Sequence, residues 1–380
     1  MEITVHRCMI IVDVATTDQG AYRLLRTRVS KINKIYNNII ACPKGDYFHK
    51  IESIGIRVVP CDILRELNFF SLRKEISMMK KMLMDINPDI VHSHNSKTGA
   101  IVRIAVQSLN TKRSRTKKII MIHQVHGYHH TLYSGFKRLF YQSIEVFLTR
   151  FTDVLIFQNK YEYELTQHYS THKNCRLYYL GNGINIEELD IFQPVIETEK
   201  INKIVCVARI EPVKNHEMLI EIAALLVHKY QYYEFEFQLI GEGNTDNLKE
   251  KINQRDLNQF FSFTGELDRK DVLKKLSEAK VAILTSFKEG LPRAIIEALI
   301  LKTPCIGTDV VGTNEVIEHE KNGFLIPLSG AELGAKHIIE LLTNNLLWKE
   351  MSDFAHKNAI EKYDEDRIIK NLIELYKLYE

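Results

Sequence analysis

Cysteine pairs are missing from this chain of 380 residues, although it contains six cysteines. They are Cys8, Cys42, Cys61, Cys175, Cys206 and Cys305. No two of them form a CxxC motif, so the spacing predicts neither a zinc site nor a disulfide framework. A reducing compartment such as the cytosol fits this cysteine usage best.

Long apolar runs and a strong charge imbalance are also absent. No stretch of 18 apolar residues occurs, and the run near the N-terminus is too short for a signal sequence, so we expect a cytoplasmic protein. The formal net charge of +3 is too small to indicate nucleic acid as the main partner, but it does not oppose an acidic ligand or membrane surface.

Short apolar runs alternate with amphipathic segments along the whole chain. The length suggests two or three domains, and the alternation is typical of an α/β fold with open parallel sheets covered by helices. The expected strands in the first half are 8–14, 37–43, 55–61, 88–94, 117–127 and 153–159. The expected strands in the second half are 202–210, 234–241, 260–266, 280–286, 303–309 and 323–327.

The segment from Thr285 to Phe324 contains the largest number of candidate ligand-binding residues. Pro292 fits the first turn of an apolar helix, which leaves the backbone donors just after it, those of Arg293, Ala294 and Ile295, to face an anion. Glu297 lies within that helix, and Glu289 precedes it by eight positions in the loop before the helix. At 1.5 Å per helical residue, the two carboxylates should lie roughly 10 Å apart, which leaves room for a diphosphate.

The phrase EGLPRAIIEA within this segment resembles the E-x7-E signature of retaining glycosyltransferases of family 4, which have the GT-B architecture of two Rossmann-like domains facing across a cleft. The resemblance implies that Glu289 binds the donor sugar and that Glu297 binds the ribose. It assigns the donor diphosphate to the loop and helix start, namely Gly290, Leu291, Arg293 and Ala294. The alternative for Glu297 is an ion pair inside a packed domain.

Two cations lie at and just after the end of the first expected strand of the second half. Arg209 and Lys214 lie five residues apart in a loop that enters a helix, so both could point at one anion. A pair of exposed surface charges is the alternative. The phrase ARIEPVK resembles the family's GR(L/I)xxxK segment, with Ala208 at the first position, and the resemblance implies that both cations hold the donor diphosphate and act in catalysis.

Glycines end the next two strands. Gly241 and Gly265, with Leu267, match the family's loops beside the nucleotide base and imply backbone contacts with the base or sugar phosphate. Glu315 matches the acid of the family's GGxxE phrase, although Val311 stands at the first glycine.

Histidines mark two strand ends in the first half. The segment DIVHSHNSKTG contains His92 and His94, and QVHGY contains His126. A structural or solvated role is the alternative for such histidines. Both phrases resemble segments of enzymes that extend bacterial surface polysaccharides, and the resemblance places His126 against the donor sugar in the cleft between the domains.

A basic run and an amphipathic segment lie between and after these histidines. The run contains Lys112, Arg113, Arg115, Lys117 and Lys118. The segment 135–151 combines basic residues with Phe, Leu and Tyr at helical spacing, as in an interfacial helix. A solvated loop and an ordinary core helix are the alternatives. Peripheral contact with an anionic membrane is therefore an expectation, because acceptors in the resembling family are commonly carried on polyprenyl diphosphate.

The same resemblance predicts the domain bounds. The phrase YLGNGIN resembles the family's exit from the first domain, and the polar segment near 190–200 is the expected linker. We expect an acceptor-binding domain at 1–190, a nucleotide-sugar domain at 191–362, and a C-terminal helix at 363–380 that returns to the first domain.

The resemblance implies transfer of a hexose or N-acetylhexosamine with retention from a nucleotide sugar, most simply a UDP-sugar, to a lipid-linked or oligosaccharide acceptor. No cofactor and no metal are expected, because an Asp-x-Asp spelling occurs near no expected donor loop and only at 364–366. Alternatives are a nucleotide-sugar epimerase of the same fold and a non-catalytic scaffold subunit.

Overall fold

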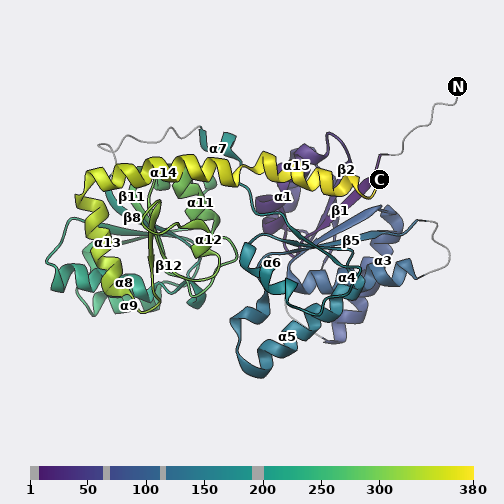
Figure 1. The fold of residues 1–380 in the computed structure, drawn as a ribbon, viewed down its shortest axis with the longest axis horizontal. Coiled ribbons are helices and arrows are strands. Elements are labelled where there is room, and N and C mark those ends of the chain that lie inside the picture. Colours follow the sequence, from purple (N-terminus) through teal and green to yellow (C-terminus); the bar gives the residue numbers. More distant parts are fainter. Residues whose placement is uncertain (1–7, 63–68, 112–116, 191–200) are drawn as a thin grey trace. The chain divides into compact units, whose positions relative to one another are not determined.

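A computed structural model describes residues 8–62, 69–111, 117–190 and 201–380. The chain divides into two compact units, of which the first comprises Met1–Gly181 with Asp366–Glu380 and the second comprises Asn182–Glu365 (Figure 1). The expected linker and three residues of the basic run, namely Lys112, Arg113 and Arg115, lie outside the described residues.

The first unit is built on a parallel sheet with the order β3-β2-β1-β4-β5-β6-β7 in the described part of the chain. Its strands are β1 (Ile10–Val14), β2 (Asn37–Cys42), β3 (Val58–Pro60), β4 (Ile90–His94), β5 (Ile120–Val125), β6 (Val154–Phe157) and β7 (Arg176–Tyr179). The first six match the strands expected from the sequence. The edge strand β7, whose residues are mostly exposed or half-buried, was not expected.

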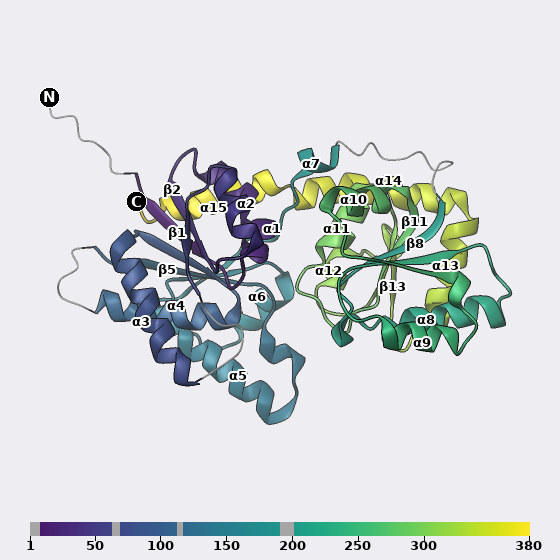
Figure 2. The same ribbon diagram turned by 180° about the vertical axis from the view of Figure 1, so that it is seen from behind.

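Helices cover both faces of this sheet. They are α1 (Asp18–Ile32), α2 (Asp46–Ser53), α3 (Phe69–Ile86), α4 (Ser96–Asn110), α5 (Gly135–Leu148), α6 (Lys160–Gln167) and α15 (Glu365–Lys377), with short 3₁₀ turns at His129–Leu132 and Thr149–Phe151. Figures 1 and 2 show α1, α2 and α15 on one face and α3, α4 and α5 on the other. Successive side chains of a strand point to opposite faces, so Val12 packs toward α3 and α4 while Ile11 packs toward α1 and α15.

The second unit is built on a parallel sheet with the order β10-β9-β8-β11-β12-β13 in the described part. Its strands are β8 (Ile201–Val207), β9 (Glu236–Ile240), β10 (Phe261–Gly265), β11 (Ala279–Leu284), β12 (Cys305–Thr308) and β13 (Gly323–Ile326). All six match the expected strands. Their apolar side chains form one core with the surrounding helices.

The helices of the second unit also lie on both faces of its sheet. They are α7 (Ile186–Asp190), α8 (Glu217–Ala224), α9 (Asp246–Asn253), α10 (Arg269–Glu278), α11 (Arg293–Ile300), α12 (Thr313–Val316), α13 (Ala331–Thr343) and α14 (Asn345–Tyr363). Short 3₁₀ turns occupy Pro212–Lys214 and Asn258–Phe260, and a π-helical segment at Leu225–Lys229 follows α8. Figures 1 and 2 show α11 and α14 on one side and α8 and α9 on the other.

The unit boundaries differ from those expected. Residues 182–190 belong with the second unit, because Ile184 forms a β-bridge with Asp364 and Leu189 joins the core of that unit. The expected return of the C-terminal helix is confirmed, since Ile369, Leu372 and Tyr376 of α15 pack in the core of the first unit.

Each sheet reverses its strand order at one point. In the first unit this point lies between β1 and β4, and in the second it lies between β8 and β11. Ligands of open α/β sheets bind outside the carboxyl ends of the strands at such points. Among the described residues, no helix is long and apolar enough to cross a membrane.

Candidate active site

Two loops meet at the carboxyl ends of β8 and β11 in the second unit. The backbone N–H of Phe287 donates to the carbonyl of Val213 at 2.9 Å, and the Thr285 hydroxyl donates to the carbonyl of Asn215 at 3.0 Å. These bonds fix the loop after β8 to the loop after β11. The residues expected to hold a donor therefore come from two neighbouring strand ends.

Lys214 and Glu289 form an ion pair across these loops. The Nζ atom of Lys214 lies 2.7 Å from Oε1 of Glu289, and the side chains are only 19% and 10% exposed. The Ser286 hydroxyl donates to the same carboxylate oxygen. Limited solvent access strengthens such a pair, so each side chain holds the other in place.

Arg209 lies in the same loop as Lys214 but has a different partner. Its Nη1 atom lies 2.7 Å from Oε1 of Glu211, and its side chain is 57% exposed. The backbone on either side is fixed, since Ala208 N donates to Ile240 O at 3.0 Å and Ile210 N donates to Glu242 O at 2.8 Å. Arg209 therefore has a fixed backbone and an exposed side chain in a surface ion pair.

Helix α11 begins at Arg293, one residue later than expected, with Pro292 at the N-cap. Its first turn closes tightly, because the N–H groups of Ile295 and Ile296 both donate to Pro292 O, at 3.1 and 3.2 Å. The expectation that Ile295 keeps a backbone donor for an anion is therefore wrong. Arg293 and Ala294 remain at the helix start, and Gly290 and Leu291 form the loop before it.

The side chain of Arg293 makes a contact within the second unit. Its Nη1 atom donates to the backbone carbonyl of Gly183 at 3.2 Å, so it ties the segment 182–190 to the start of α11. Arg293 therefore has a structural role within the second unit, in addition to the predicted contact with a ligand.

Glu297 is buried and forms the ion pair that was its alternative interpretation. Arg269 Nη1 donates to Glu297 Oε1 at 2.7 Å, and Arg269 Nε donates to Glu188 Oε2 at 2.8 Å. Partial burial lowers the pKa of Arg269, but the Glu297 and Glu188 carboxylates outweigh that effect and raise it. Glu297 therefore has a structural partner, and its expected contact with ribose stays a prediction.

Glycines bring the remaining loops close to this site. A Cβ atom at Gly241 would lie 2.1 Å from Ala208 O, and one at Gly312, where φ is +87°, would lie 2.7 Å from Glu289 O. Gly241 N donates to Gly265 O at 2.9 Å, and Leu267 packs against the core. The glycines thus let the loops approach each other, and a side chain at position 312 would collide with the backbone of Glu289.

The first unit contains a buried polar cluster at the end of β1 and β4. Asp13 is fully buried, and its carboxylate accepts hydrogen bonds from Arg28 of α1, from Asn38 Nδ2 at 2.9 Å and from His94 Nε2 at 2.8 Å. Burial by itself raises the pKa of Asp13, but Arg28 and the bond from His94 hold it well below its usual value. Asp13 is therefore a carboxylate.

His94 connects this carboxylate to His126. A carboxylate can only accept, so His94 Nε2 carries the proton in that bond, although Arg28 also lies 3.1 Å from the same nitrogen. Burial lowers the pKa of His94, which keeps its ring neutral. His94 Nδ1 is then an acceptor, and His126 Nε2, at 3.0 Å, must be the donor. The network therefore requires a proton on Nε2 of His126.

His92 stacks on His94 with ring centroids 4.5 Å apart and shares a hydrogen bond of 2.8 Å with the Tyr376 hydroxyl of α15. One ligand atom each from Asp13, His92 and His94 lie within 4.8 Å of one another, a spacing that could hold a metal ion. The Arg28 guanidinium already neutralises the same carboxylate, and it would repel a cation there.

Several of these residues were not predicted from the sequence. Asp13 interrupts an apolar strand, and this signal could have identified it as a buried, paired carboxylate. Arg28, Arg269 and Tyr376 are ordinary helix residues in the sequence, and their partners lie 15 or more positions away.

Two family models match consecutive parts of the chain. The model for glycosyl transferases group 1 matches residues 187–362, and the model for glycosyltransferase family 4 matches residues 35–188. Together they extend without a gap from 35 to 362.

Individual relatives agree with these matches. The chain is 27% identical over 320 residues to the UDP-Gal:alpha-D-GlcNAc-diphosphoundecaprenol alpha-1,3-galactosyltransferase of Escherichia coli, covering 80% of this chain and 79% of that protein. It is 23% identical over 354 residues to the N,N'-diacetylbacillosaminyl-diphospho-undecaprenol alpha-1,3-N-acetylgalactosaminyltransferase of Campylobacter jejuni, covering 89% and 90%. The crystal structure of Anabaena HepE with UDP and glucose has the same fold, with a TM-score of 0.80, 15% identity and 97% and 99% coverage.

Proposed function

The chain belongs to the group 1 and family 4 glycosyltransferases, and we propose that it transfers a hexose or N-acetylhexosamine with retention from a UDP-sugar to a lipid-linked glycan. The chain is thus a transferase of the GT-B fold, and the two relatives described above act, by their names, on acceptors carried by diphosphoundecaprenol. The donor, the stereochemistry and the acceptor form the proposal.

The observation that carries the proposal is the ion pair between Lys214 and Glu289 at the point where the second sheet reverses its order. A donor bound there would meet a cation suited to its diphosphate and a carboxylate suited to sugar hydroxyls. The start of α11 lies in the same loop region as Glu289 and adds the positive end of a helix dipole.

In the proposed reaction, the bond between the anomeric carbon and the diphosphate oxygen breaks, and a bond to an acceptor hydroxyl oxygen forms on the same face of the sugar. The acceptor proton passes to the leaving diphosphate. Lys214, Arg209 and the N-terminus of α11 stabilise the charge that builds on the leaving group, while Glu289 orients the sugar. In the first unit, His126 Nε2 donates to His94 Nδ1, and this bond fixes the orientation of the His126 ring.

The names of the two relatives support a UDP-sugar donor and a lipid-linked acceptor. The Escherichia coli relative uses UDP-galactose by its name, and both relatives have diphosphoundecaprenol acceptors. A uracil base and a polyprenyl diphosphate carrier are therefore the first choices for this chain. Activity at the inner face of a membrane, without a metal or other cofactor, completes the proposal.

The test is calorimetry of the full chain with UDP, GDP and ADP sugars, followed by transfer to a polyprenyl-diphosphate-linked sugar and NMR of the product. We expect binding of UDP-sugars and a product whose anomeric configuration equals that of the donor. An isomerised sugar nucleotide would indicate an epimerase instead, and an inverted product would refute retention.

A further inference from the structure

Helix α5 turns an apolar stripe toward solvent. Phe136, Leu139, Phe140 and Phe147 are 81%, 62%, 52% and 51% exposed, and their spacing of i, i+3, i+4 and i+11 places them on one side of the helix. Ile144 extends the same stripe and is 38% exposed. A soluble surface helix normally turns such a stripe toward the core.

A polar contact attaches the opposite side of α5 to the first unit. Glu145 pairs with Arg103 of α4, whose Nη2 atom lies 2.9 Å from the carboxylate and whose side chain is fully buried. Arg103 Nε also donates to Gly99 O at 3.0 Å. Of the α5 residues, only Leu148 is buried. The fold therefore does not use the apolar stripe, which remains available to a partner.

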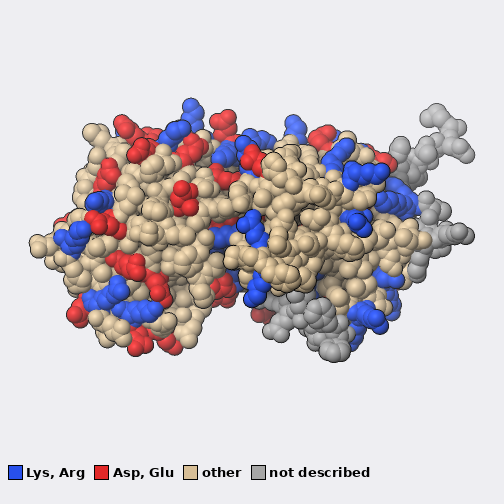
Figure 3. All heavy atoms as spheres, turned by 60° about the horizontal axis from the view of Figure 1, so that its bottom comes forward, with Lys and Arg blue, Asp and Glu red and all other residues tan. Residues whose placement is uncertain are grey.

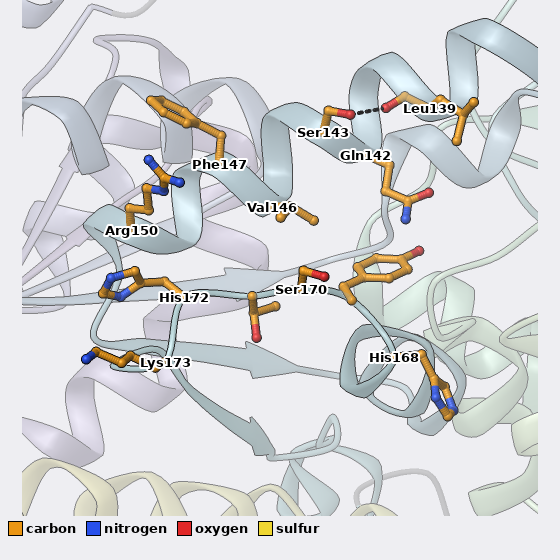
Figure 4. Close-up of a pocket in the computed structure, with 12 residues that line it drawn as sticks. Leu139, Gln142, Ser143, Val146, Phe147, Arg150, His168, Ser170, His172 and Lys173 are labelled. Carbon is orange, nitrogen blue, oxygen red and sulfur yellow. Dashed lines mark hydrogen bonds between the residues drawn. The ribbon is translucent and has the colours of Figure 1, made fainter.

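A pocket of about 630 Å³ lies beside this stripe, between α5 and the segment 168–173 that follows α6. Leu139 and Phe147 belong both to the stripe and to the pocket wall. Arg150, His172 and Lys173 lie together at one end of the pocket, and Ser170 lies near its middle (Figure 4). The pocket thus combines an apolar wall with a group of cationic and hydrogen-bonding side chains.

The charged side chains around the pocket are positive, apart from one paired carboxylate. Segments 133–151 and 168–173 contain Lys137, Arg138, Arg150 and Lys173, and Glu145, paired with Arg103, is their only acidic residue. In the described part of the chain, neither Arg150 nor Lys173 forms an ion pair; Arg150 instead lies over the Phe147 ring at 5.6 Å. Figure 3, which brings forward the side of the first unit with α5, shows Lys and Arg among neutral residues there.

We infer that α5 and this pocket dock the first unit on an anionic lipid bilayer. The stripe enters the boundary between head groups and acyl chains, and the pocket takes a lipid phosphate on Arg150, His172 and Lys173. An exposed apolar helix side bordered by cations is the arrangement of interfacial helices. The inference rests on the proposed function in one respect, because a lipid-linked acceptor would have to be reached at a membrane.

The experiment measures sedimentation of the full chain with vesicles, without any nucleotide, at physiological salt. We expect binding to vesicles of equal parts phosphatidylglycerol and phosphatidylcholine, and little binding to phosphatidylcholine alone. Phe136→Ser and Phe147→Ser should each lower the partition coefficient by about tenfold, since each removes a buried aromatic side chain from the bilayer. Arg150→Gln and Lys173→Gln should each lower it by about fivefold.

Matched controls lie on other exposed surfaces of the same unit. Ile35→Ser and Ile54→Ser remove side chains that are 51% and 48% exposed, and Lys34→Gln and Lys44→Gln remove two exposed charges. We expect the control variants to partition like the wild type. Two double variants, Lys34→Gln/Lys44→Gln and Arg150→Gln/Lys173→Gln, make the same change of net charge. If both lower the partition coefficient equally, general electrostatic attraction explains the binding and the inference is overturned.

Two further outcomes would also overturn it. If 10-fold excess glycerol phosphate over lipid abolishes binding while the Phe variants bind normally, the pocket is a site for a soluble phosphate. If the wild type does not bind anionic vesicles, the stripe serves a protein partner. Transfer assays with the wild type are separate: vesicle binding without any transfer contradicts the proposed function, and transfer without vesicle binding contradicts only this inference.

Discussion

The Nζ atom of Lys214 lies 2.7 Å from Oε1 of Glu289, so a residue assigned to the donor diphosphate and one assigned to the donor sugar hold each other in this structure. A diphosphate that binds Lys214 must compete with Glu289 for its ammonium group. Donor binding and the orientation of Glu289 are therefore coupled, because the carboxylate that loses its cation can accept hydrogen bonds from sugar hydroxyls instead.

Glu289→Gln tests this coupling. We expect transfer to be nearly abolished, because the amide is a weaker acceptor for sugar hydroxyls, while UDP affinity stays within a few fold and shifts toward tighter binding. The reason for the shift is that Lys214 loses its competing carboxylate. Calorimetry with UDP and initial rates of transfer measure the two effects.

Ser286→Ala is the matched control for that variant. It removes a second hydrogen bond to the same Glu289 oxygen but keeps the pair with Lys214, so UDP affinity should not change. If Glu289→Gln weakens UDP as much as it weakens transfer, the assignment of Glu289 to the sugar is wrong.

Glu297→Gln should affect both stability and UDP affinity. Losing a charged hydrogen bond to ribose should weaken UDP by about 1.5–3 kcal/mol. Losing the charge beside Arg269 should also lower the free energy of unfolding, by about 1–3 kcal/mol, since Arg269 is one third exposed and keeps Glu188.

Glu188→Gln separates these two roles of Glu297. It removes the other, more exposed partner of Arg269, so it should cost less than about 1 kcal/mol of stability and leave UDP affinity unchanged. A Glu297→Gln variant with a lower Tm but normal UDP affinity would mean that Glu297 is a structural residue only.

The sequence predicted the strands well because each is a short apolar run between turn signals, and β7 was missed because Arg176–Tyr179 is a short edge strand with little apolar burial. It also placed Lys214 and Glu289 in loops at strand ends, and the structure shows that these strands, β8 and β11, are neighbours. It could not predict which opposite charges pair. Arg269 and Glu297 are 28 positions apart, and only the packing of α10 against α11 brings them together.

The same limit applies to the histidines. Three histidines were identified at strand ends, but their hydrogen-bond partners depend on register. Asp13 pairs with His92 across β1 and β4, which places both side chains on the sheet face covered by α1 and α15. The charge and tautomer of this cluster follow from Arg28 and Asp13 together, and neither residue carries a recognisable motif.

The tautomer of His126 is open to direct measurement. In ¹⁵N spectra of histidine-labelled protein, we expect a protonated Nε2 for His126, because His94 Nδ1 can only accept. His94→Phe removes that acceptor while filling the space, and it should lower kcat by about tenfold or more with little change in UDP affinity. An unprotonated His126 Nε2 in the wild type would refute the proposed chain from Asp13.

Acid should destabilise the first unit through its buried histidines. Burial lowers the pKa of His92, His94 and His123, whereas the unfolded side chains titrate near 6.5. Below about pH 6.5 the unfolded state therefore binds more protons, and stability falls as pH falls, by up to about 1.4 kcal/mol per pH unit for each histidine.

Thermal unfolding at pH 7.5 and 5.5 measures this effect. Trp348, the only tryptophan, lies in the second unit, so its fluorescence reports that unit while circular dichroism reports both. His123→Gln should reduce the pH dependence, and His49→Gln, at an exposed position, should not. Equal midpoints at the two pH values would contradict the assignment of neutral buried histidines.

The last prediction concerns the charge that develops on the leaving diphosphate. An Asp-x-Asp motif with a divalent metal would be one way to neutralise it, but Asp366 pairs with Lys31 of α1, and Asp364 and Asp366 belong to different units. Lys214 and Arg209 offer positive charge at the donor loops instead, and Glu211 must release Arg209 for it to reach a ligand.

We therefore expect full activity in excess EDTA, and a loss in kcat/KM of about 100-fold or more for Lys214→Ala or Arg209→Ala, the scale of removing a preorganised electrostatic partner. Lys203→Ala makes the same change of net charge near the start of β8 and should have no such effect. Glu211→Gln should not reduce the rate, because it removes only the competing partner of Arg209. Activity that disappears with EDTA and returns with Mg²⁺ or Mn²⁺ would show that a metal, rather than these two cations, carries the leaving group's charge.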